Sequence, residues 1–299
     1  MYKEKLFVLS AGRREGFRER GNPALNGVAS LPKKKEFFMK TMKHLFVLTA
    51  FAAATAGFAF AQELTGREIM QKVDKREKAA TDSFTMRMTL TNSSGKQRVR
   101  EVTAYSKDYG SEEKTVMVFL LPADVKGVGY LSFSYDDASK SDDRWLYMPA
   151  LKKAKRISGS SSQEYFMGTD FTYDDISGHK IDDYTYTLLA EETLNEKNCW
   201  KIESVPVKKS MYSKYVSWID KESLVQVKAE FYDEQGTLLK VLTVSGIEKK
   251  DGFWTAGKME MNNLQKKHTT LIETLKHEFN KNIPDSYFRV NSLEEGKIR

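Results

Sequence analysis

The sequence predicts a mainly β protein, built as a long antiparallel meander with few helices. Phe84, Met86, Met88 and Leu90 alternate with polar residues, which is the period of a strand that buries one face. Similar short apolar segments recur along the chain and are separated by glycine-containing turns, as in sheets joined by hairpins. The one well-marked helix signal comes before all of these segments.

That helix is expected over residues 65–79. Thr65 can cap its first turn, and Glu68, three residues on, completes a capping box. Ile69 and Val73 form an apolar stripe, while the charged residues face water. An amphipathic helix of this kind needs a surface to cover, and a sheet would supply it.

The strands follow the helix in order, beginning with residues 84–90. Further strands are expected at residues 99–105, 115–121, 130–135, 144–148, 184–189, 200–205, 215–219, 225–232 and 238–245. Hairpin turns are expected at residues 92–96, 233–236 and 249–252. A C-terminal turn carrying Tyr287, Phe288 and Leu293 is expected to dock on the sheet.

Residues 259–279 fit two kinds of structure. Leu271, Leu275 and Phe279 recur every four residues, which favours a helix. Met259 and Met261 alternate with polar residues, which favours strands, and the threonines that precede Leu271 agree with this second reading. The residues alone leave both open.

Residues 39–61 have the pattern of a secretory signal peptide. A basic start is followed by an apolar run at 45–60 and by an A-x-A exit that ends at Ala61. Cleavage between Ala61 and Gln62 is expected, which would leave a soluble periplasmic protein. A retained transmembrane anchor is the alternative interpretation, because the run has the minimum length for a span.

Residues 1–38 precede this signal and carry arginines without apolar periodicity. We interpret them as an upstream extension that is not part of the natural product, with translation starting at Met39 or Met42. Residues 1–61 hold 11 of the 48 Lys and Arg and 4 of the 41 Asp and Glu, so residues 62–299 carry equal numbers of basic and acidic side chains. Without a basic excess, nucleic acid is excluded as a partner.

No grouping of side chains predicts catalysis, a cofactor or a metal site. His179, His268 and His277 lie at no ligand spacing with one another or with Cys199, the single cysteine. We expect the histidines on solvated strand faces, and Cys199 as a small packed hydrophobe. A Ser-His-acid triad stays open, although no serine lies in a Gly-x-Ser-x-Gly turn. The acid pairs at 136–137, 142–143, 174–175 and 182–183 are expected in turns and at sheet edges. The chain is therefore not expected to be an enzyme.

Two aromatic blocks are the most distinctive segments. Residues 166–175 read Phe-Met-Gly-Thr-Asp-Phe-Thr-Tyr-Asp-Asp, and residues 145–149 read Trp-Leu-Tyr-Met-Pro. They combine aromatic rings, a flexible thioether and acids around one glycine, without a nucleophile and base. Met fills irregular volumes and tolerates varied ligands, although ordinary core packing is an equally good explanation for each Met alone. Together these blocks indicate a ligand-binding surface and not a catalytic site.

The order and spacing of these blocks resemble the outer membrane lipoprotein-sorting (LolA-like) periplasmic proteins. Later motifs agree, including a strand that starts at Cys199 and closes at Pro206, the Trp-Ile-Asp at 218–220 and the Phe-Tyr-Asp at 231–233. The resemblance spans residues 64–293. It implies one LolA-like β domain over residues 62–299, a half-open antiparallel β-barrel with few covering helices, and strands over residues 259–279.

The resemblance also implies a function. It indicates a periplasmic carrier that binds acyl chains of lipoproteins or lipids and moves them between inner and outer membranes as a monomer, after loading by an inner-membrane transporter. The helix at 65–79 and the segment 166–173 are candidate lids, with Gly168 as the hinge. The candidate cavity or lid residues are Met86, Met88, Phe119, Trp145, Tyr147, Phe166, Met167, Phe171 and Tyr173. The alternative is a non-catalytic accessory subunit that docks an envelope transport complex.

Overall fold

The computed structural model describes residues 64–137, 139–178 and 180–298. All described residues belong to one compact unit, Glu63–Arg299. The upstream extension, the signal peptide and the cleavage site predicted above lie outside the described residues, as does His179. Within the described part, no helix combines the length and the apolar character needed to cross a membrane.

The first helix, α2, covers Gly66–Asp74 and begins as predicted. Thr65 Oγ1 accepts a hydrogen bond from the Glu68 backbone, and Glu68 Oε2 accepts one from the Thr65 backbone at 2.8 Å, which completes the capping box. The predicted end at residue 79 is wrong. By Ala80 the backbone N–H bonds to Asn280 Oδ1, because the chain there is already aligned for the first strand.

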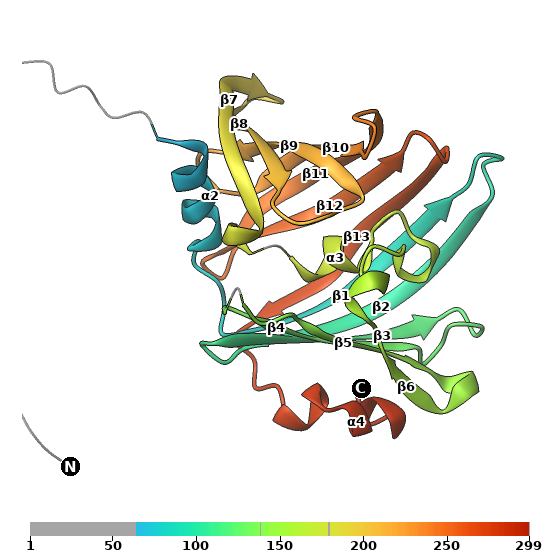
Figure 1. The fold of residues 1–299 in the computed structure, drawn as a ribbon. Helices are drawn as coiled ribbons and strands as arrows, with labels where there is room; N and C mark the ends of the chain where they lie inside the picture. The colour runs from blue at the N-terminus through green and yellow to red at the C-terminus, as the bar shows by residue number, and fades with distance from the viewer. Residues whose placement is uncertain (1–63, 138, 179, 299) are drawn as a thin grey trace, which may run out of the picture. The chain divides into compact units, whose positions relative to one another are not determined.

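The strands form one antiparallel sheet that is not closed (Figure 1). They are β1 (Thr81–Thr91), β2 (Gln97–Asp108), β3 (Glu112–Leu121), β4 (Gly129–Tyr135), β5 (Asp143–Met148), β6 (Lys153–Arg156), β7 (Tyr184–Leu194), β8 (Lys197–Pro206), β9 (Tyr212–Asp220), β10 (Gln226–Asp233), β11 (Leu238–Lys250), β12 (Phe253–Asn263) and β13 (His268–Phe279). Each strand pairs with the next strand in sequence, except that β6 does not pair with β7. β1 also pairs with β13, so β6 and β7 are the two free edges of the sheet. This arrangement confirms the half-open antiparallel barrel.

The ambiguous region 259–279 is strand, as the resemblance implied. β12 and β13 pair with each other, and β13 pairs with β1 with a register shift between Thr85 and Met86. Leu275 lies at this irregularity and is exposed, while Phe279 is buried. The four-residue recurrence therefore does not mark one buried helix face. The short edge strand β6 was not predicted from sequence.

The two faces of the sheet carry different cores. The main core lies inside the curve of the sheet, and the short helix α3 (Tyr173–Ser177) lies between its two halves (Figure 1). On the outer face, η5 (Asp285–Phe288) and α4 (Val290–Glu294) cover β3 to β6 through Phe288 and Leu293. The predicted docking of the C-terminal turn is confirmed, and Gly129 permits it because a Cβ there would lie 2.5 Å from Leu293 Cδ2.

Helix α2 packs against the other half of the sheet. Ile69 is fully buried with Ile202 and Ile219. A Cβ at Gly66 would lie 2.8 Å from the Leu188 backbone nitrogen, so only glycine lets the first turn approach β7 this closely. The helix is thereby fixed beside a free sheet edge.

Candidate ligand-binding site

The chain that connects the two free edges enters the interior of the sheet. Residues 157–183 run from β6 to β7, and we call residues 164–177 the plug. Within it, Tyr165 bridges Thr172 and the Phe166 N–H donates to the Phe171 carbonyl, forming a small closed loop. Phe166 is 1% exposed, and its ring centroid lies 5.9 Å from that of Phe119. The plug therefore fills part of the concave face with its own aromatic rings.

A buried ion pair holds the plug to β11. Lys240 Nζ lies 2.6 Å from Asp175 Oδ2 and donates to the Asp170 carbonyl at 2.8 Å. The two side chains are 0% and 4% exposed. Burial lowers the pKa of Lys240, and the negative charge of Asp175 opposes that shift. Tyr212 donates its hydroxyl to the same carboxylate, and burial raises the pKa of Tyr212.

Further polar contacts fix the plug to three other strands. Asp170 Oδ2 lies 2.6 Å from His268 Nδ1 and accepts a hydrogen bond from Thr270 Oγ1 at 2.7 Å. Arg100, on β2, donates to the Met167 carbonyl, and Asn263, at the end of β12, donates to the Tyr165 hydroxyl. The plug is thus tied to β2, β11, β12 and β13 by groups that are largely removed from water.

These contacts correct two sequence expectations. Asp175 was expected in a turn or at an edge, and it is instead a buried ion-pair partner. His268 was expected on a solvated face, and it bonds the buried Asp170. The one sequence signal for this network is Lys240, a cation in the middle of the apolar run Leu-Leu-Lys-Val-Leu at 238–242.

The nine predicted site residues divide between two places. Six lie in the buried main core and Met167 packs against it, the six being Met86, Met88, Phe119, Phe166, Phe171 and Tyr173. Trp145 and Tyr147 instead belong to the outer cluster with the C-terminal helix, while Leu146 between them packs on the main core. Because successive residues of a strand point to opposite faces, Trp145 and Tyr147 face the outer cluster while Leu146 faces the interior.

An open apolar pocket adjoins the main core at the α2 end of the sheet. It has a volume of about 320 Å³ beside β1, β12 and β13 and is lined by the apolar side chains Phe84, Phe253, Met259 and Phe279. Charged residues also line it, namely those at 76–78 together with Asp82, Lys107, Asp108 and Glu113. Phe84 and Met259 also pack against the main core, so the pocket continues the apolar interior. A second cavity of about 660 Å³ beside α2 shares Trp254 with it.

A hydroxyl, an imidazole and a carboxylate meet in this apolar pocket. Thr255 Oγ1 lies 2.6 Å from His277 Nδ1, and His277 Nε2 lies 2.6 Å from Asp82 Oδ1. The expectation that His277 lies on a solvated face is wrong, because its side chain is mostly buried between strands. The chain of contacts links β12, β13 and β1. In the described residues, no group of three or more His, Cys, Asp or Glu could hold a metal ion.

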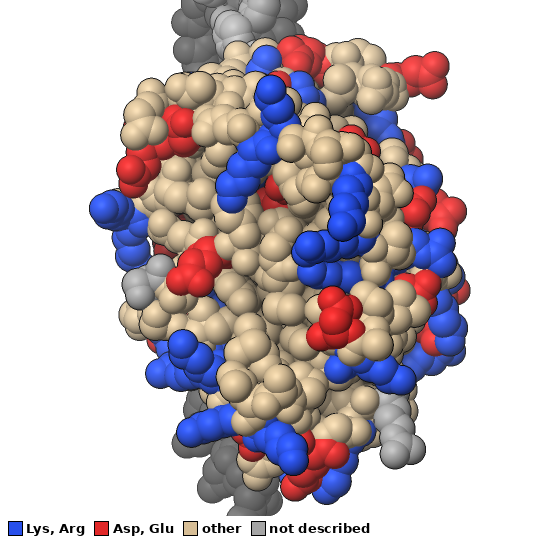
Figure 2. Space-filling view, turned by 90° about the vertical axis from the view of Figure 1, so that its right-hand side faces the viewer, with Lys and Arg blue, Asp and Glu red and all other residues tan. Residues whose placement is uncertain are grey.

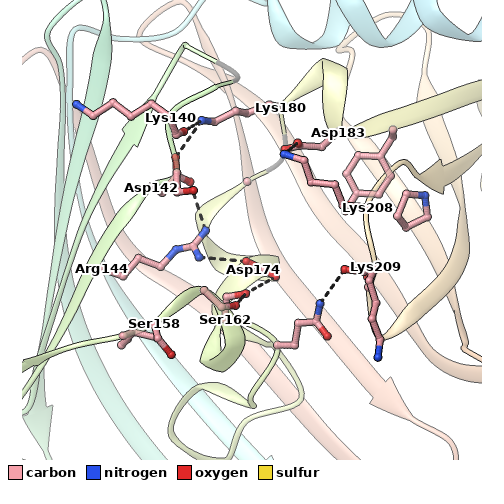
Figure 3. A pocket seen from close by; sticks show the side chains of 18 of the residues that line it. Lys140, Asp142, Arg144, Ser158, Ser162, Asp174, Lys180, Asp183, Lys208 and Lys209 are labelled. Carbon is pink, nitrogen blue, oxygen red and sulfur yellow. Dashed lines mark hydrogen bonds and ion pairs between the residues drawn. The ribbon is translucent and has the colours of Figure 1, made fainter.

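A polar cleft of about 640 Å³ lies between the two sheet edges (Figure 3). Arg144 of β5 pairs with Asp174 of the plug at 3.1 Å and with Asp142 at 3.3 Å. Ser162 donates to the same Asp174, and Lys180 reaches Asp142 at 3.4 Å. These contacts attach the plug to the β5 side of the opening.

The backbone at the predicted hinge is left-handed. Gly168 has φ of +75° with no atom within 4 Å of a Cβ built on it, and Met167 before it has φ of 49°. Two consecutive left-handed residues make the exposed turn of the plug. Whether the plug and α2 open as lids stays a prediction.

Comparisons with known proteins agree with this geometry. A family model described as "Uncharacterized protein" matches residues 111–295. A Vibrio parahaemolyticus domain described as an outer membrane lipoprotein-sorting protein is 34% identical with a TM-score of 0.72, over 77% of this chain and 98% of that one. A DUF1329 family protein from Desulfovibrio piger is 32% identical with a TM-score of 0.73, over 76% of this chain and 97% of that one. No curated protein matches.

A LolA superfamily protein from Nitrosomonas europaea has the same fold at 20% identity, with a TM-score of 0.59 over 76% of this chain and 99% of that one. The half-open antiparallel sheet thus has a LolA-type fold. The chain belongs to the family of outer membrane lipoprotein-sorting proteins.

Proposed function

We propose that this protein is a non-catalytic periplasmic carrier, acting as a monomer without a cofactor. It binds acyl chains of lipoproteins or lipids and moves them between inner and outer membranes after loading by an inner-membrane transporter. The observation that carries the proposal is the open apolar pocket next to a plug whose aromatic rings occupy the remaining concave face. The description of the Vibrio parahaemolyticus relative as a lipoprotein-sorting protein supports the same cargo class.

The need for such a carrier follows from the cost of exposing hydrocarbon to water. Each methylene of an acyl chain is worth about 0.8 kcal/mol on burial, so a dozen exposed methylenes cost about 10 kcal/mol. A half-open sheet can enclose a chain and still release it, because one side lacks a covalent or hydrogen-bonded closure. The opening between β6 and β7 has this property.

The acyl chain begins in the pocket around Phe84 and Met259 and extends along the concave face. Withdrawal of Phe166 and Phe171 would vacate the volume beside Phe119, which the chain then fills. The plug in this proposal protects the apolar face when no cargo is bound. Replacing the plug by an acyl chain requires breaking the polar contacts of the plug to four strands, and these contacts set the free-energy cost of the replacement.

Uptake of a fluorescent fatty acid by delipidated protein tests the proposal. Phe84→Asp places a charge in the half-buried pocket, and we expect it to weaken binding about tenfold or more, because an unpaired charge is excluded from an apolar site. Leu275→Asp, on the exposed part of β13, is the matched control and leaves uptake unchanged.

Mass spectrometry of lipid that co-purifies with the native protein gives a second readout. Bound acyl lipid supports the carrier. Protein that carries no lipid, takes up no fatty acid and is indifferent to Phe84→Asp would favour the accessory docking subunit instead.

A further inference from the structure

One end of the sheet gathers exposed apolar side chains. Five of the turns at this end, at residues 92–98, 122–128, 149–153, 233–237 and 264–267, lie on the right in Figure 1, the side that faces the viewer in Figure 2. Five of the ten exposed large hydrophobic residues in the described chain lie in these turns or next to them. They are Val99, Leu120, Leu121, Leu151 and Leu264. An end that holds half of these side chains is not an average piece of surface.

Four of these residues lie on β2, on β3 and in the turn between β5 and β6, and we call them the apolar rim: Val99, Leu120, Leu121 and Leu151. Leu121 pairs with Glu101 across β2 and β3, and Val99 lies two residues along β2 on the same face. The turn after Leu121 contacts the turn that carries Leu151, since a Cβ at Gly127 would lie 3.3 Å from Pro149 Cγ. Leu151 is 62% exposed.

The same turns are strongly basic. Their exposed cations are Lys96, Arg98, Lys126, Lys152, Lys153, Lys266 and Lys267, which we call the basic rim. The acids in these turns are Asp124, the partly exposed Asp233, and Glu234. Residues 62–299 carry balanced charge, so this excess of cations at one end is a local feature. Figure 2 shows an uncharged strip in the middle of this side of the molecule, with Lys and Arg and also Asp and Glu around it.

The plug reaches this end. Arg100 near the start of β2 donates to Met167, and Lys266 lies 3.3 Å from the centroid of the Tyr165 ring. The plug therefore contacts one residue of the basic rim, and Gly168 in its turn is exposed.

We propose that this end of the sheet docks on the surface of an anionic phospholipid bilayer. Leucines on separate turns enter the boundary between headgroups and acyl chains, while the cations around them meet lipid phosphates. Charge complementarity favours a bilayer, because a uniformly anionic plane satisfies cations spread over five turns. The biological role of this docking rests on the proposed carrier function. Docking places the turn of the plug beside the bilayer that donates an acyl chain to the protein or receives one from it.

Vesicle co-sedimentation tests the docking surface, with protein purified after secretion and with its N-terminus determined. We expect binding to vesicles of phosphatidylethanolamine and phosphatidylglycerol, and little binding to phosphatidylcholine alone. Lys126→Gln with Lys152→Gln should weaken binding about thirtyfold at low salt, since each cation near an anionic surface contributes about a factor of five. Lys249→Gln with Lys250→Gln, in exposed positions outside the rim, is the matched control.

The apolar rim is tested separately. Leu121→Asp with Leu151→Asp should weaken vesicle binding about tenfold or more, whereas Leu189→Asp with Leu275→Asp, equally exposed elsewhere, should have little effect. Absence of binding to anionic vesicles, or equal loss in the rim and control variants, would overturn the proposal and direct attention to a protein partner. Fatty acid uptake in solution is measured on the same variants. Vesicle binding without fatty acid uptake would contradict the carrier function and support the docking surface. Fatty acid uptake without vesicle binding would support the carrier function and contradict the docking surface.

Discussion

Lys240 and Asp175 form an ion pair inside the sheet, with 2.6 Å between Nζ and Oδ2 and both side chains almost completely removed from water. Removing two charges from water is costly, and their attraction commonly does no more than balance that cost. The pair therefore adds little to the net free energy of folding. Its main effect is to fix where the plug lies against β11. The aromatic rings of the plug then pack in one arrangement.

Breaking this pair should be strongly destabilising. Lys240→Met leaves Asp175 as a buried charge without its cation, and we expect a loss of about 3–5 kcal/mol in the free energy of unfolding, measured by urea denaturation. The double variant Lys240→Met with Asp175→Asn should recover a large part of that loss. Equal stability of the single variant and the unaltered protein would show that the pair does not hold the plug.

Gly66 should tolerate no side chain. In Gly66→Ala the Cβ would contact the β7 backbone at Leu188 and Thr187, and backbone cannot move aside as a side chain can. We expect a loss of about 1–3 kcal/mol in thermal or urea unfolding. Gly159→Ala is the matched control, since nothing lies within 4 Å of a Cβ at that position and its stability should hardly change. A neutral Gly66→Ala would mean that α2 packs less closely on β7.

The C-terminal segment should loosen in acid. Hydrogen bonds from Lys107 and from Tyr109 lower the pKa of Asp285 below its ordinary value of 3.8. A carboxyl group with a lowered folded-state pKa stabilises the fold above its ordinary pKa, and that contribution is lost as pH falls below about 4. Hydrogen exchange of η5 and α4 should therefore accelerate in this window, and Asp285→Asn should remove that part of the pH dependence. An unchanged acid response in Asp285→Asn would refute the assignment.

The hydrogen-bonded residues Thr255, His277 and Asp82 should not catalyse a reaction. A hydroxyl bonded to an imidazole that is bonded to a carboxylate is also the arrangement of hydrolases with a catalytic triad. The carrier proposal predicts that purified protein hydrolyses no ester above background, and that Thr255→Val changes only stability. Ester turnover that is abolished by Thr255→Val would replace the carrier by an enzyme.

Local patterns in the sequence predicted most of the fold. Phe84, Met86, Met88 and Leu90 alternate as predicted and face the main core. The capping box of Thr65 and Glu68 also formed as expected, because both depend on residues that are neighbours in sequence. The choice between helix and strand over 259–279 needed the family resemblance, since the register irregularity opposite Met86 is set by a partner strand far away in sequence.

The site was less accessible to prediction. Lys240 and Asp175 are 65 residues apart, and nothing in either local pattern shows that they meet. Trp145 and Tyr147 were chosen for their aromatic rings, but strand alternation turns both toward the C-terminal segment. The plug itself lacks regular periodicity, so its position inside the sheet follows only from long-range contacts.

Photo-crosslinking with a diazirine fatty acid tests the central claim most directly, because it reports where an acyl chain lies. The account predicts labels on β1, β12 and β13 around Phe84 and Met259, with further labels near Phe119 when the plug is displaced. No label at all, or labels confined to the outer face around Trp145 and Phe288, would contradict the claim that the concave face binds acyl chains.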